Sequence, residues 1–255
     1  MRAYQYIKAV EASEVLRIIL ANPPLNILNI EMMEEINSAL ERIKLKPGIK
    51  VLVIAAEGRA FSAGVSIEDH LGGRANQMLI VFDRIFRQLH SLPCVTVAAV
   101  QGAALGGGAE LAAFCDVVVA SDNAKIGQPE IKAGVFAPIA ALHYPNRIGQ
   151  ARTLQMLLSG DALEAREAER AGLVDRVVPA GQLDAAVEES VKKFTDKSGA
   201  VLAMTRRAVL GSQNEFELRL DELEALYMNQ LMECQDASEG LRAFLEKRQP
   251  VWSNR

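Results

Sequence analysis

Two glutamates lie in settings where a carboxyl group can do acid–base chemistry. Glu110 sits within an otherwise apolar segment, and Glu130 follows Gly127-Gln128-Pro129. A buried carboxylate without a partner is unfavourable, so each glutamate is either paired with a cation or used in chemistry. Two carboxyl groups brought to one cleft can act as general acid and general base when their surroundings separate their pKa values. The structural alternative is an ion pair with Arg147 or Arg152.

A glycine cluster opens the segment that carries Glu110. Gly106-Gly107-Gly108 follows the apolar run Cys94–Val100, and its spacing does not match the glycine patterns of phosphate-binding loops. Amides at a helix N-terminus have no internal partner, and glycines let a ligand approach them closely. The segment therefore suits an oxygen that gains negative charge, such as an enolate or a tetrahedral oxyanion. A tight packing turn is the structural alternative.

A second loop of mostly small residues, Ala60-Phe61-Ser62-Ala63-Gly64-Val65, follows the apolar run Val51–Ala56. Because strand ends of a parallel sheet meet at one edge, we expect this loop and the glycine cluster to line the same site. Ser62 lies outside a G-x-S-x-G elbow and no histidine follows at triad-like positions, which argues against a serine hydrolase. The three histidines lack metal-ligand spacing, so no metal site is expected.

The hydrophobic pattern predicts an α/β scaffold for these residues. Strands are expected at Tyr4–Ala9, Val15–Leu20, Val51–Ala56, Cys94–Val100 and Val117–Ala120. One helix is expected from the N-cap Asn29 to Pro47-Gly48, and another over Asn76–Leu89. Apolar strands that alternate with helices are typical of a parallel sheet with right-handed crossovers.

From about Phe136 the pattern becomes mostly helical. Helices are expected over Ala165–Ala171, Leu183–Phe194 and Ala200–Leu210, then a long helix capped by Asn214, and a last helix that begins with a capping-box-like pair, Asp236 and Glu239. The long helix carries an apolar stripe of Phe216, Leu220, Leu223, Tyr227 and Leu231. We expect this stripe to be exposed and to pack on a neighbouring subunit. Residues 1–195 would then be the core and 196–255 a helical oligomerisation region.

Composition and charge narrow the function classes. The chain has 255 residues, of which 50% are hydrophobic, and a net charge of −4, so we expect a folded protein without a nucleic-acid partner. Three cysteines without C-x-x-C spacing indicate a reducing compartment. The longest apolar stretches are shorter than the roughly 20 residues of a membrane span, and no signal-like apolar region is visible. A cytoplasmic address is therefore expected, with no membrane partner.

Taken together, these segments resemble the crotonase superfamily of enoyl-CoA hydratases and isomerases. The matching segments are Ala60–Val65, Val100–Leu111, Gly127–Glu130, Ala171–Val174 and Ala243–Arg248. The resemblance implies an α/β crotonase-like fold, with stacked ββα units, mostly parallel sheets and a helical C-terminal region. It also implies a homotrimer or homohexamer, an acyl-CoA thioester substrate, and no separate cofactor, because coenzyme A is part of the substrate.

The resemblance also implies roles for individual residues. The backbone N–H groups of Val65 and Gly107 would hold the thioester oxygen, and Glu110 and Glu130 would be the paired acid and base. The remaining CoA- and substrate-binding residues would be Ala63, Ser66, Ile67, Glu68, Phe136, Pro138, Phe244 and Lys247, the last two reaching the CoA of an adjacent subunit. Two carboxyl groups favour addition or elimination of water, so a hydratase is predicted. A double-bond isomerase and a non-catalytic RNA-binding or assembly protein are the alternatives.

Two segments depart from the family pattern. Ser66 stands where the hydratases usually have Asp, and 135–141 replaces the usual glycine-rich stretch along the acyl pocket. Phe136, Pro138 and Ile139 are expected to stiffen and fill that pocket. Both departures resemble the hydratases that act on cyclohexa-1,5-diene-1-carbonyl-CoA in anaerobic aromatic degradation. A compact cyclic acyl group is therefore expected, with water adding at the far end of the conjugated system.

Overall fold

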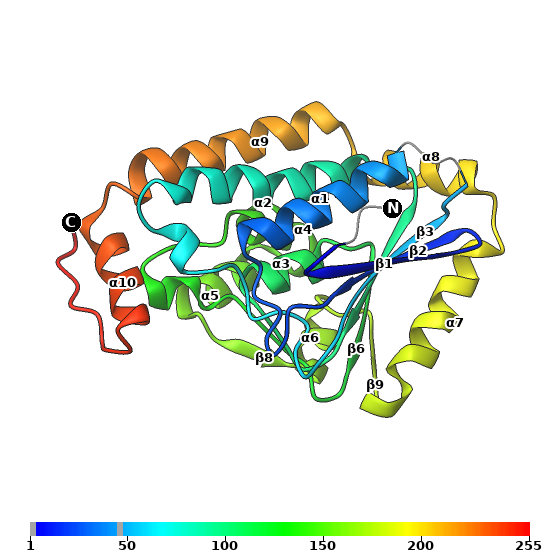
Figure 1. Ribbon diagram of the computed structural model, residues 1–255, viewed down its shortest axis with the longest axis horizontal. Coiled ribbons are helices and arrows are strands. Elements are labelled where there is room, and N and C mark those ends of the chain that lie inside the picture. Colours follow the sequence, from blue (N-terminus) through cyan, green and yellow to red (C-terminus); the bar gives the residue numbers. More distant parts are fainter. Residues whose placement is uncertain (1–3, 45–47) are drawn as a thin grey trace.

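A six-stranded sheet organises the protein in the computed structural model, which describes residues 4–44 and 48–255 (Figure 1). Its strands, in spatial order, are β1 (Ile7–Ala12), β2 (Val15–Leu20), β3 (Val51–Ala56), β4 (Val95–Val100), β6 (Val117–Ser121) and β9 (Arg176–Val178). Only the β1–β2 hairpin is antiparallel among the strand pairs of this sheet in the described residues. The predicted parallel sheet is confirmed, although β1 begins later in the chain than expected.

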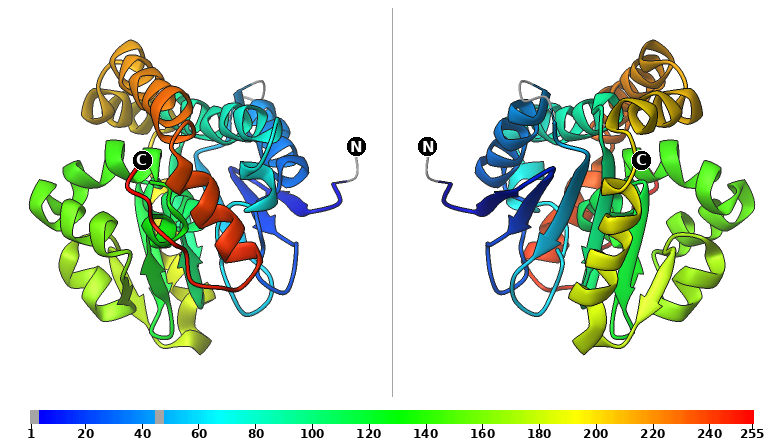
Figure 2. Two further views of the ribbon diagram at one scale, coloured as in Figure 1. Left: turned by 90° about the vertical axis from the view of Figure 1, so that its left-hand side faces the viewer. Right: turned by 90° about the vertical axis from the view of Figure 1, so that its right-hand side faces the viewer.

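Both faces of the sheet are covered, which explains why its central strands are apolar throughout. On one face Val51, Val53 and Val97 pack against α7 (Leu183–Thr195). The other face, with Leu52, packs into the main core beneath α1 (Ile30–Lys44) and α2 (Arg74–Ser91). Figure 2 views the molecule from its two ends, with α10 (Gln235–Leu245) in front at one end and α7 at the other.

The start of α1 follows the expected capping chemistry. Asn29 Oδ1 accepts a hydrogen bond from the backbone N–H of Met32 at 2.9 Å, which satisfies one of the unpaired amides of the first turn. The predicted end of this helix at Pro47 lies outside the described residues. The next helix, α2, is two residues longer at each end than predicted.

A second, three-stranded sheet was not predicted. It contains β5 (Ala103–Leu105), β7 (Lys125–Gly127) and β8 (Ala162–Glu164), and β5 leads directly to α3 (Gly107–Ala113). Strands of three residues are too short to show an alternating pattern, so the sequence carries no periodic signal for them. Their pairing fixes the backbone just before the glycine cluster.

The other elements are mainly helical. They are the 3₁₀ turns η1 (Glu68–His70), η2 (Pro129–Ala133) and η3 (Ala180–Gln182), the helices α4 (Pro138–Ile148), α5 (Gln150–Ser159), α6 (Ala165–Ala171), α8 (Gly199–Leu210) and α9 (Gln213–Leu226), and a π-helical turn, η4 (Tyr227–Leu231). The division of the chain at residue 195 stays a prediction. No helix within the described residues combines the length and apolar character needed to cross a bilayer.

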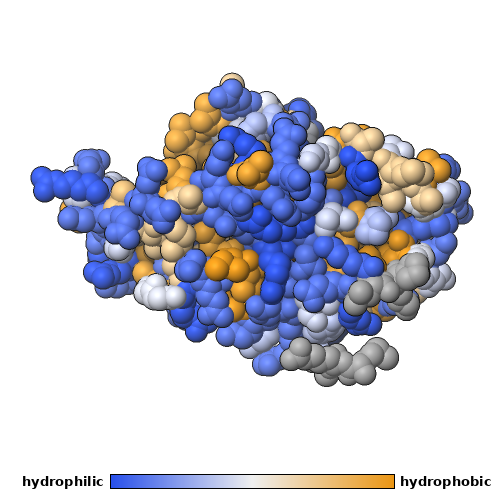
Figure 3. Space-filling model, turned by 90° about the horizontal axis from the view of Figure 1, so that it is seen from above, coloured by the Kyte–Doolittle hydropathy of each residue, from blue (hydrophilic) through white to orange (hydrophobic). Residues whose placement is uncertain are grey.

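The apolar stripe on α9 and η4 packs against its own chain, so the prediction that it is exposed is wrong. Leu220 and Tyr227 are buried, and Phe216 packs on the main core, because α9 lies against α2 and α4. Seen from the α9 side, the surface is mainly hydrophilic with separate hydrophobic patches (Figure 3). The helix also begins after Ser212 rather than at the predicted cap Asn214.

The predicted capping box of the last helix is also wrong. Cys234 is the N-cap of α10, and the carboxylates of Asp236 and Glu239 bind the segment that follows the helix. Asp236 accepts the N–H of Ser253 at 2.7 Å, and Glu239 accepts the N–H of Val251 at 2.9 Å. Both acidic side chains face the returning segment, residues 251–254, and accept hydrogen bonds from its backbone N–H groups. In a capping box, they would accept them from the first turn of the helix.

Candidate active site

The two predicted loops meet, as the strand-end argument requires. The backbone N–H of Ser62 donates to the carbonyl of Ala103 at 3.1 Å, and the N–H of Leu105 donates to the carbonyl of Ser62 at 2.9 Å. Val65 consequently lies against Gly107, where an added Cβ would be 2.6 Å from Val65 Cγ2. Gly107 must therefore be glycine, because the Val65 side chain and the Phe82 ring leave no room for a Cβ.

Two backbone amides are available to a ligand at this junction. Within the described residues, the N–H groups of Val65 and Gly107 have no hydrogen-bond acceptor. Gly107 is the first residue of α3, where the N-cap Gly106 has a φ of 52° that favours glycine. Unpaired amides at a helix N-terminus carry the positive end of the peptide dipoles, so they stabilise an oxygen that becomes negative.

Glu110 projects from α3 to the first turn of α4. Its side chain is buried, and one carboxyl oxygen accepts the N–H of Ala140 at 2.8 Å, with the N–H of Ile139 also bound. Burial and then the neighbouring Glu130 carboxyl raise the pKa of Glu110 to about 8. The alternative of an ion pair with Arg147 is wrong, because that guanidinium binds backbone carbonyls and Asp175.

Glu130 reaches the same point from η2. An added Cβ on Gly106 would lie 2.5 Å from Glu130 Oε1, which places the carboxyl group directly over the glycine cluster. Burial raises the pKa of Glu130 to about 7. Two carboxyl groups with raised pKa values beside a pair of amides can exchange protons with a ligand near neutral pH.

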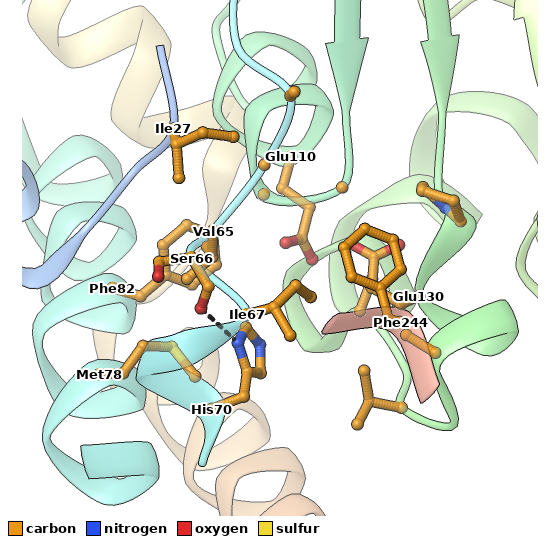
Figure 4. A pocket seen from close by; sticks show the side chains of 18 of the residues that line it. Ile27, Val65, Ser66, Ile67, His70, Met78, Phe82, Glu110, Glu130 and Phe244 are labelled. Atoms are coloured by element: carbon orange, nitrogen blue, oxygen red, sulfur yellow. Dashed lines mark hydrogen bonds between the residues drawn. The ribbon is translucent and has the colours of Figure 1, made fainter. Parts of the chain in front are cut away.

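These groups share a cavity of about 640 Å³ (Figure 4). The predicted site residues that line it are Ala63, Val65, Ser66, Ile67, Glu68, Gly107, Glu110, Glu130, Phe136, Pro138 and Phe244. Figure 4 shows Glu110 and Glu130 side by side on one wall, with Val65 and Phe82 across the cavity. The remaining wall is largely apolar, so the cavity suits a hydrocarbon group joined to a polar, charge-accepting oxygen.

One predicted placement is wrong, and two others stay predictions. Ile139 does not fill the cavity, because its side chain is buried in the main core and its backbone amide serves Glu110 instead. Phe244 lines the cavity of its own chain and is exposed, and its predicted contact with the CoA of an adjacent subunit stays a prediction. Lys247 is exposed beyond the end of α10 and is not among the residues of this cavity, so its contact with the CoA of an adjacent subunit also stays a prediction.

Sequence reasoning missed several cavity residues. Met78 and Phe82 of α2 and Tyr227 of η4 line it, and the Tyr227 ring meets Phe136 edge to face at 5.3 Å between centroids. His70 was not among those missed, because it follows the loop Ala60–Val65 closely in the sequence; it lines the cavity, and its Nδ1–H donates to the carbonyl of Ser66 at 2.8 Å. Tyr227 was expected in an exposed stripe, and helical spacing alone does not distinguish a cavity wall from a packed core or a subunit interface.

The turn that carries Glu130 is held by the last helix. An added Cβ on Gly240 of α10 would lie 2.4 Å from the carbonyl oxygen of Ala133, and one on Gly134 would lie 2.7 Å from that of Asp236. Backbone therefore packs directly on backbone between η2 and α10. Any side chain at either glycine would push the two elements apart and move Glu130.

The possible metal-binding side chains in the described residues do not form a metal centre. Across residues 4–44 and 48–255, no three His, Cys, Asp or Glu side chains gather closely enough to hold a metal ion. The chemistry offered by the cavity is that of carboxyl groups and amides.

Comparison with known proteins agrees with this geometry. Residues 11–255 match the family model described as enoyl-CoA hydratase/isomerase. The chain is 37% identical over 245 residues to the cyclohexa-1,5-dienecarbonyl-CoA hydratase of Thauera aromatica, covering 94% of this chain and 93% of that protein.

Solved structures agree as well. An enoyl-CoA hydratase from Mycobacterium avium subsp. paratuberculosis superposes with a TM-score of 0.88 at 29% identity, covering 98% of this chain and all of the other. A carnitinyl-CoA hydratase from Mycobacterium avium gives a TM-score of 0.88 at 27% identity, with 99% and 100% covered. With its fold, its paired glutamates and its two free amides, this chain belongs to the enoyl-CoA hydratase/isomerase family.

Proposed function

We propose that the protein is a hydratase that adds water to an α,β-unsaturated acyl-CoA thioester. One observation carries the proposal: two carboxyl groups, the buried Glu110 and the partly buried Glu130, lie in one cavity beside the unpartnered amides of Val65 and Gly107. Addition of water needs a base for the water, an acid for carbon and an anion site for the thioester oxygen. The cavity supplies all three, so no separate cofactor is proposed.

In this mechanism the thioester oxygen accepts hydrogen bonds from the Val65 and Gly107 amides. As water attacks the conjugated double bond, negative charge moves to that oxygen, and each amide stabilises the resulting enolate by about 3–4 kcal/mol. One glutamate removes a proton from the attacking water while the oxygen of that water bonds to carbon. The other delivers a proton to carbon and collapses the enolate to the hydroxyacyl thioester.

We propose a compact cyclic dienoyl-CoA as the substrate. Phe136 and Pro138 occupy the wall beyond the glutamates, and Phe82 and Tyr227 close the cavity from α2 and η4. Rigid aromatic and proline side chains favour a short, flat acyl group over an extended one. The relative from Thauera aromatica, named for a cyclohexadienecarbonyl-CoA substrate, supports the same choice.

We also propose a cytoplasmic trimer or hexamer. The apolar stripe on α9 packs on its own chain and therefore does not support assembly. However, α5 and α8 expose large apolar side chains: Leu158 is 68%, Met204 65% and Val209 80% exposed. Such groups are commonly covered by another subunit. Sedimentation at micromolar concentration tests this proposal, and a stable species with the 27.7 kDa mass of one chain would contradict it.

The function is tested by incubating the purified protein with cyclohexa-1,5-diene-1-carbonyl-CoA and crotonyl-CoA together and following products by mass spectrometry. A hydratase adds the mass of one water, whereas an isomerase leaves the mass unchanged and a non-catalytic protein yields no product. We expect a higher kcat/KM for the cyclic thioester. A preference for crotonyl-CoA would refute the cyclic substrate and leave the hydratase intact.

A further inference from the structure

One polar side chain on the apolar part of the cavity wall has no task in the mechanism above. His70 ends the 3₁₀ turn η1, is 9% exposed and lines the cavity. Its Nδ1 lies 2.8 Å from the carbonyl oxygen of Ser66, and Figure 4 shows this bond as a dashed line. The other ring nitrogen, Nε2, has no hydrogen-bond partner among the described residues.

The bond to Ser66 fixes which nitrogen of His70 carries the proton. A carbonyl oxygen only accepts hydrogen bonds, so Nδ1 is the N–H donor. Burial lowers the pKa of His70 by more than the Ser66 bond and the neighbouring Asp69 carboxylate raise it, so the ring is neutral near pH 7. A neutral ring with its proton on Nδ1 leaves a lone pair on Nε2, which can only accept a hydrogen bond.

Nε2 of His70 opens on the cavity. Among the described residues, the buried polar atoms without a partner include the Tyr227 hydroxyl but not this nitrogen, so Nε2 is reached from the cavity and is not sealed in the core. Water meets the lone pair in the free protein. A ligand that displaces this water keeps its affinity only if it brings an N–H or O–H donor of its own.

The wall that holds His70 suits the acyl end of a thioester. An added Cβ on Gly107 would lie 3.0 Å from the Phe82 ring, so this ring lies next to the amide proposed to receive the thioester oxygen. Met78 lies one turn earlier on α2, and η1 packs on the same helix. Because Phe82 and Met78 are buried and apolar, a hydrocarbon group fits this wall better than the polar arm of coenzyme A.

Building on the hydratase function proposed above, we propose that His70 is a specificity-determining residue whose Nε2 accepts a hydrogen bond from a hydroxyl group on the acyl part of the thioester. A cyclic dienoyl group has no O–H donor, whereas its hydrated product has one. The contact therefore forms with the hydroxyacyl thioester and favours that complex over the unsaturated one. His70 keeps its proton on Nδ1 throughout.

Two substitutions separate this role from that of holding the Ser66 carbonyl. His70→Asn keeps an N–H donor near the position of Nδ1 but has no atom at the position of Nε2. His70→Gln places a carbonyl oxygen near the position of Nε2 and so restores the acceptor, but it loses the donor to Ser66. Met78→Leu, which alters the same wall without a polar group, is the matched control.

The measurement is the dissociation constant of two ligands by calorimetry, in a Glu130→Gln background that stops the addition and loss of water. One ligand is the hydroxycyclohexene thioester formed by hydration of cyclohexa-1,5-diene-1-carbonyl-CoA, and the other is cyclohex-1-ene-1-carbonyl-CoA, which lacks the hydroxyl. We expect His70→Asn to weaken binding of the hydroxylated ligand about tenfold and to leave the other ligand unchanged. His70→Gln should recover most of this loss, and Met78→Leu should leave the ratio of the two constants unchanged.

Nitrogen-15 NMR of histidine-labelled protein gives a readout that needs no turnover. The His70 signals, assigned by their loss in His70→Asn, should show a protonated Nδ1 and an unprotonated Nε2. Of the two ligands, only the hydroxylated one should shift the Nε2 signal in the direction of an accepted hydrogen bond.

Equal weakening of both ligands in His70→Asn would overturn the proposal, because Nε2 would then contact the coenzyme arm. An unchanged ratio in His70→Asn or a proton on Nε2 would also overturn it. If the wild type hydrates no thioester but prefers the hydroxylated ligand through His70, the hydratase function fails while this contact stands. If His70→Asn does not fold, the NMR shift in the His70 protein decides alone, with its signals assigned from His70→Gln.

Discussion

Gly106→Ala offers a test of the catalytic geometry that spares the rest of the fold. The new Cβ would lie 2.5 Å from Glu130 Oε1, whereas ordinary contacts begin at 3.4 Å. The carboxyl group would therefore move by about 1 Å, a displacement that can lower a rate about a hundredfold. That loss corresponds to about 2.7 kcal/mol of transition-state stabilisation. Because the obstructing atom ends a side chain, Glu130 can move and the backbone need not.

The backbone strain of this variant must be measured separately. Gly106 has a φ of 52° and a ψ of −132°, a conformation that costs an alanine about 1–3 kcal/mol. Gly211 is a matched control, because its φ of 80° and ψ of −157° also favour glycine and an added Cβ there meets nothing within 4 Å. We expect Gly211→Ala to lose similar stability in urea denaturation while keeping full kcat/KM.

The assay is hydration of the cyclic dienoyl-CoA under kcat/KM conditions, with folding checked by circular dichroism. Gly106→Ala should fold and fall about a hundredfold below the wild type. A folded Gly106→Ala protein within threefold of wild-type activity would refute the reasoning, because Glu130 could then be displaced without consequence.

Three further outcomes are expected. Glu110→Gln and Glu130→Gln should each fold and lose hydration by about a hundredfold or more in steady-state assays, and near-normal turnover in both would remove them as acid and base. Burial raises the pKa of Glu110 to about 8, so the wild type loses stability as the pH rises from about 4.5 to 8. The melting temperature of Glu110→Gln should therefore rise relative to that of the wild type over this pH range. A constant difference between the two melting temperatures would contradict this. Arg206→Ala should lower the free energy of unfolding, measured by urea denaturation, by about 3–5 kcal/mol. The reason is that Arg206 is 8% exposed and binds Asp116 and three backbone carbonyls at the end of α2. A loss under about 1 kcal/mol would show that the pairing is unimportant.

The layered fold and the meeting of the two loops could be predicted from the sequence. Val51–Ala56 and the run ending at Val100 are apolar because the strands are covered on both faces, and short continuous apolar runs are typical of strands in a parallel sheet. Two parallel strands end at one edge whatever the later packing, so the loop Ala60–Val65 and the glycine cluster were correctly expected to lie together. These inferences needed only local periodicity and the geometry of a parallel sheet.

Other features depend on contacts between distant segments and could not be predicted. The Ile139 side chain packs away from the cavity because α4 turns its first amides toward Glu110. Tyr227 is turned inward by the packing of α9 on α2, although its spacing fitted an exposed stripe equally well. Asp236 acquires its partners from the returning segment at Ser253 rather than from its own helix. In each case the partner lies far away in the sequence.

The packing of α10 on η2 ties the final geometry of the active site to a helix that is synthesised after the catalytic residues. Glu130 and the glycine cluster leave the ribosome well before α10, and until α10 arrives the backbone at Ala133 and Gly134 lacks its support. A nascent chain that ends before Gln235 contains Glu110, Glu130 and the glycine cluster but lacks the packing of α10 on η2. It would also lack Phe244 at the mouth of the cavity. The positions of the catalytic groups therefore depend on a helix that follows all of them in the chain.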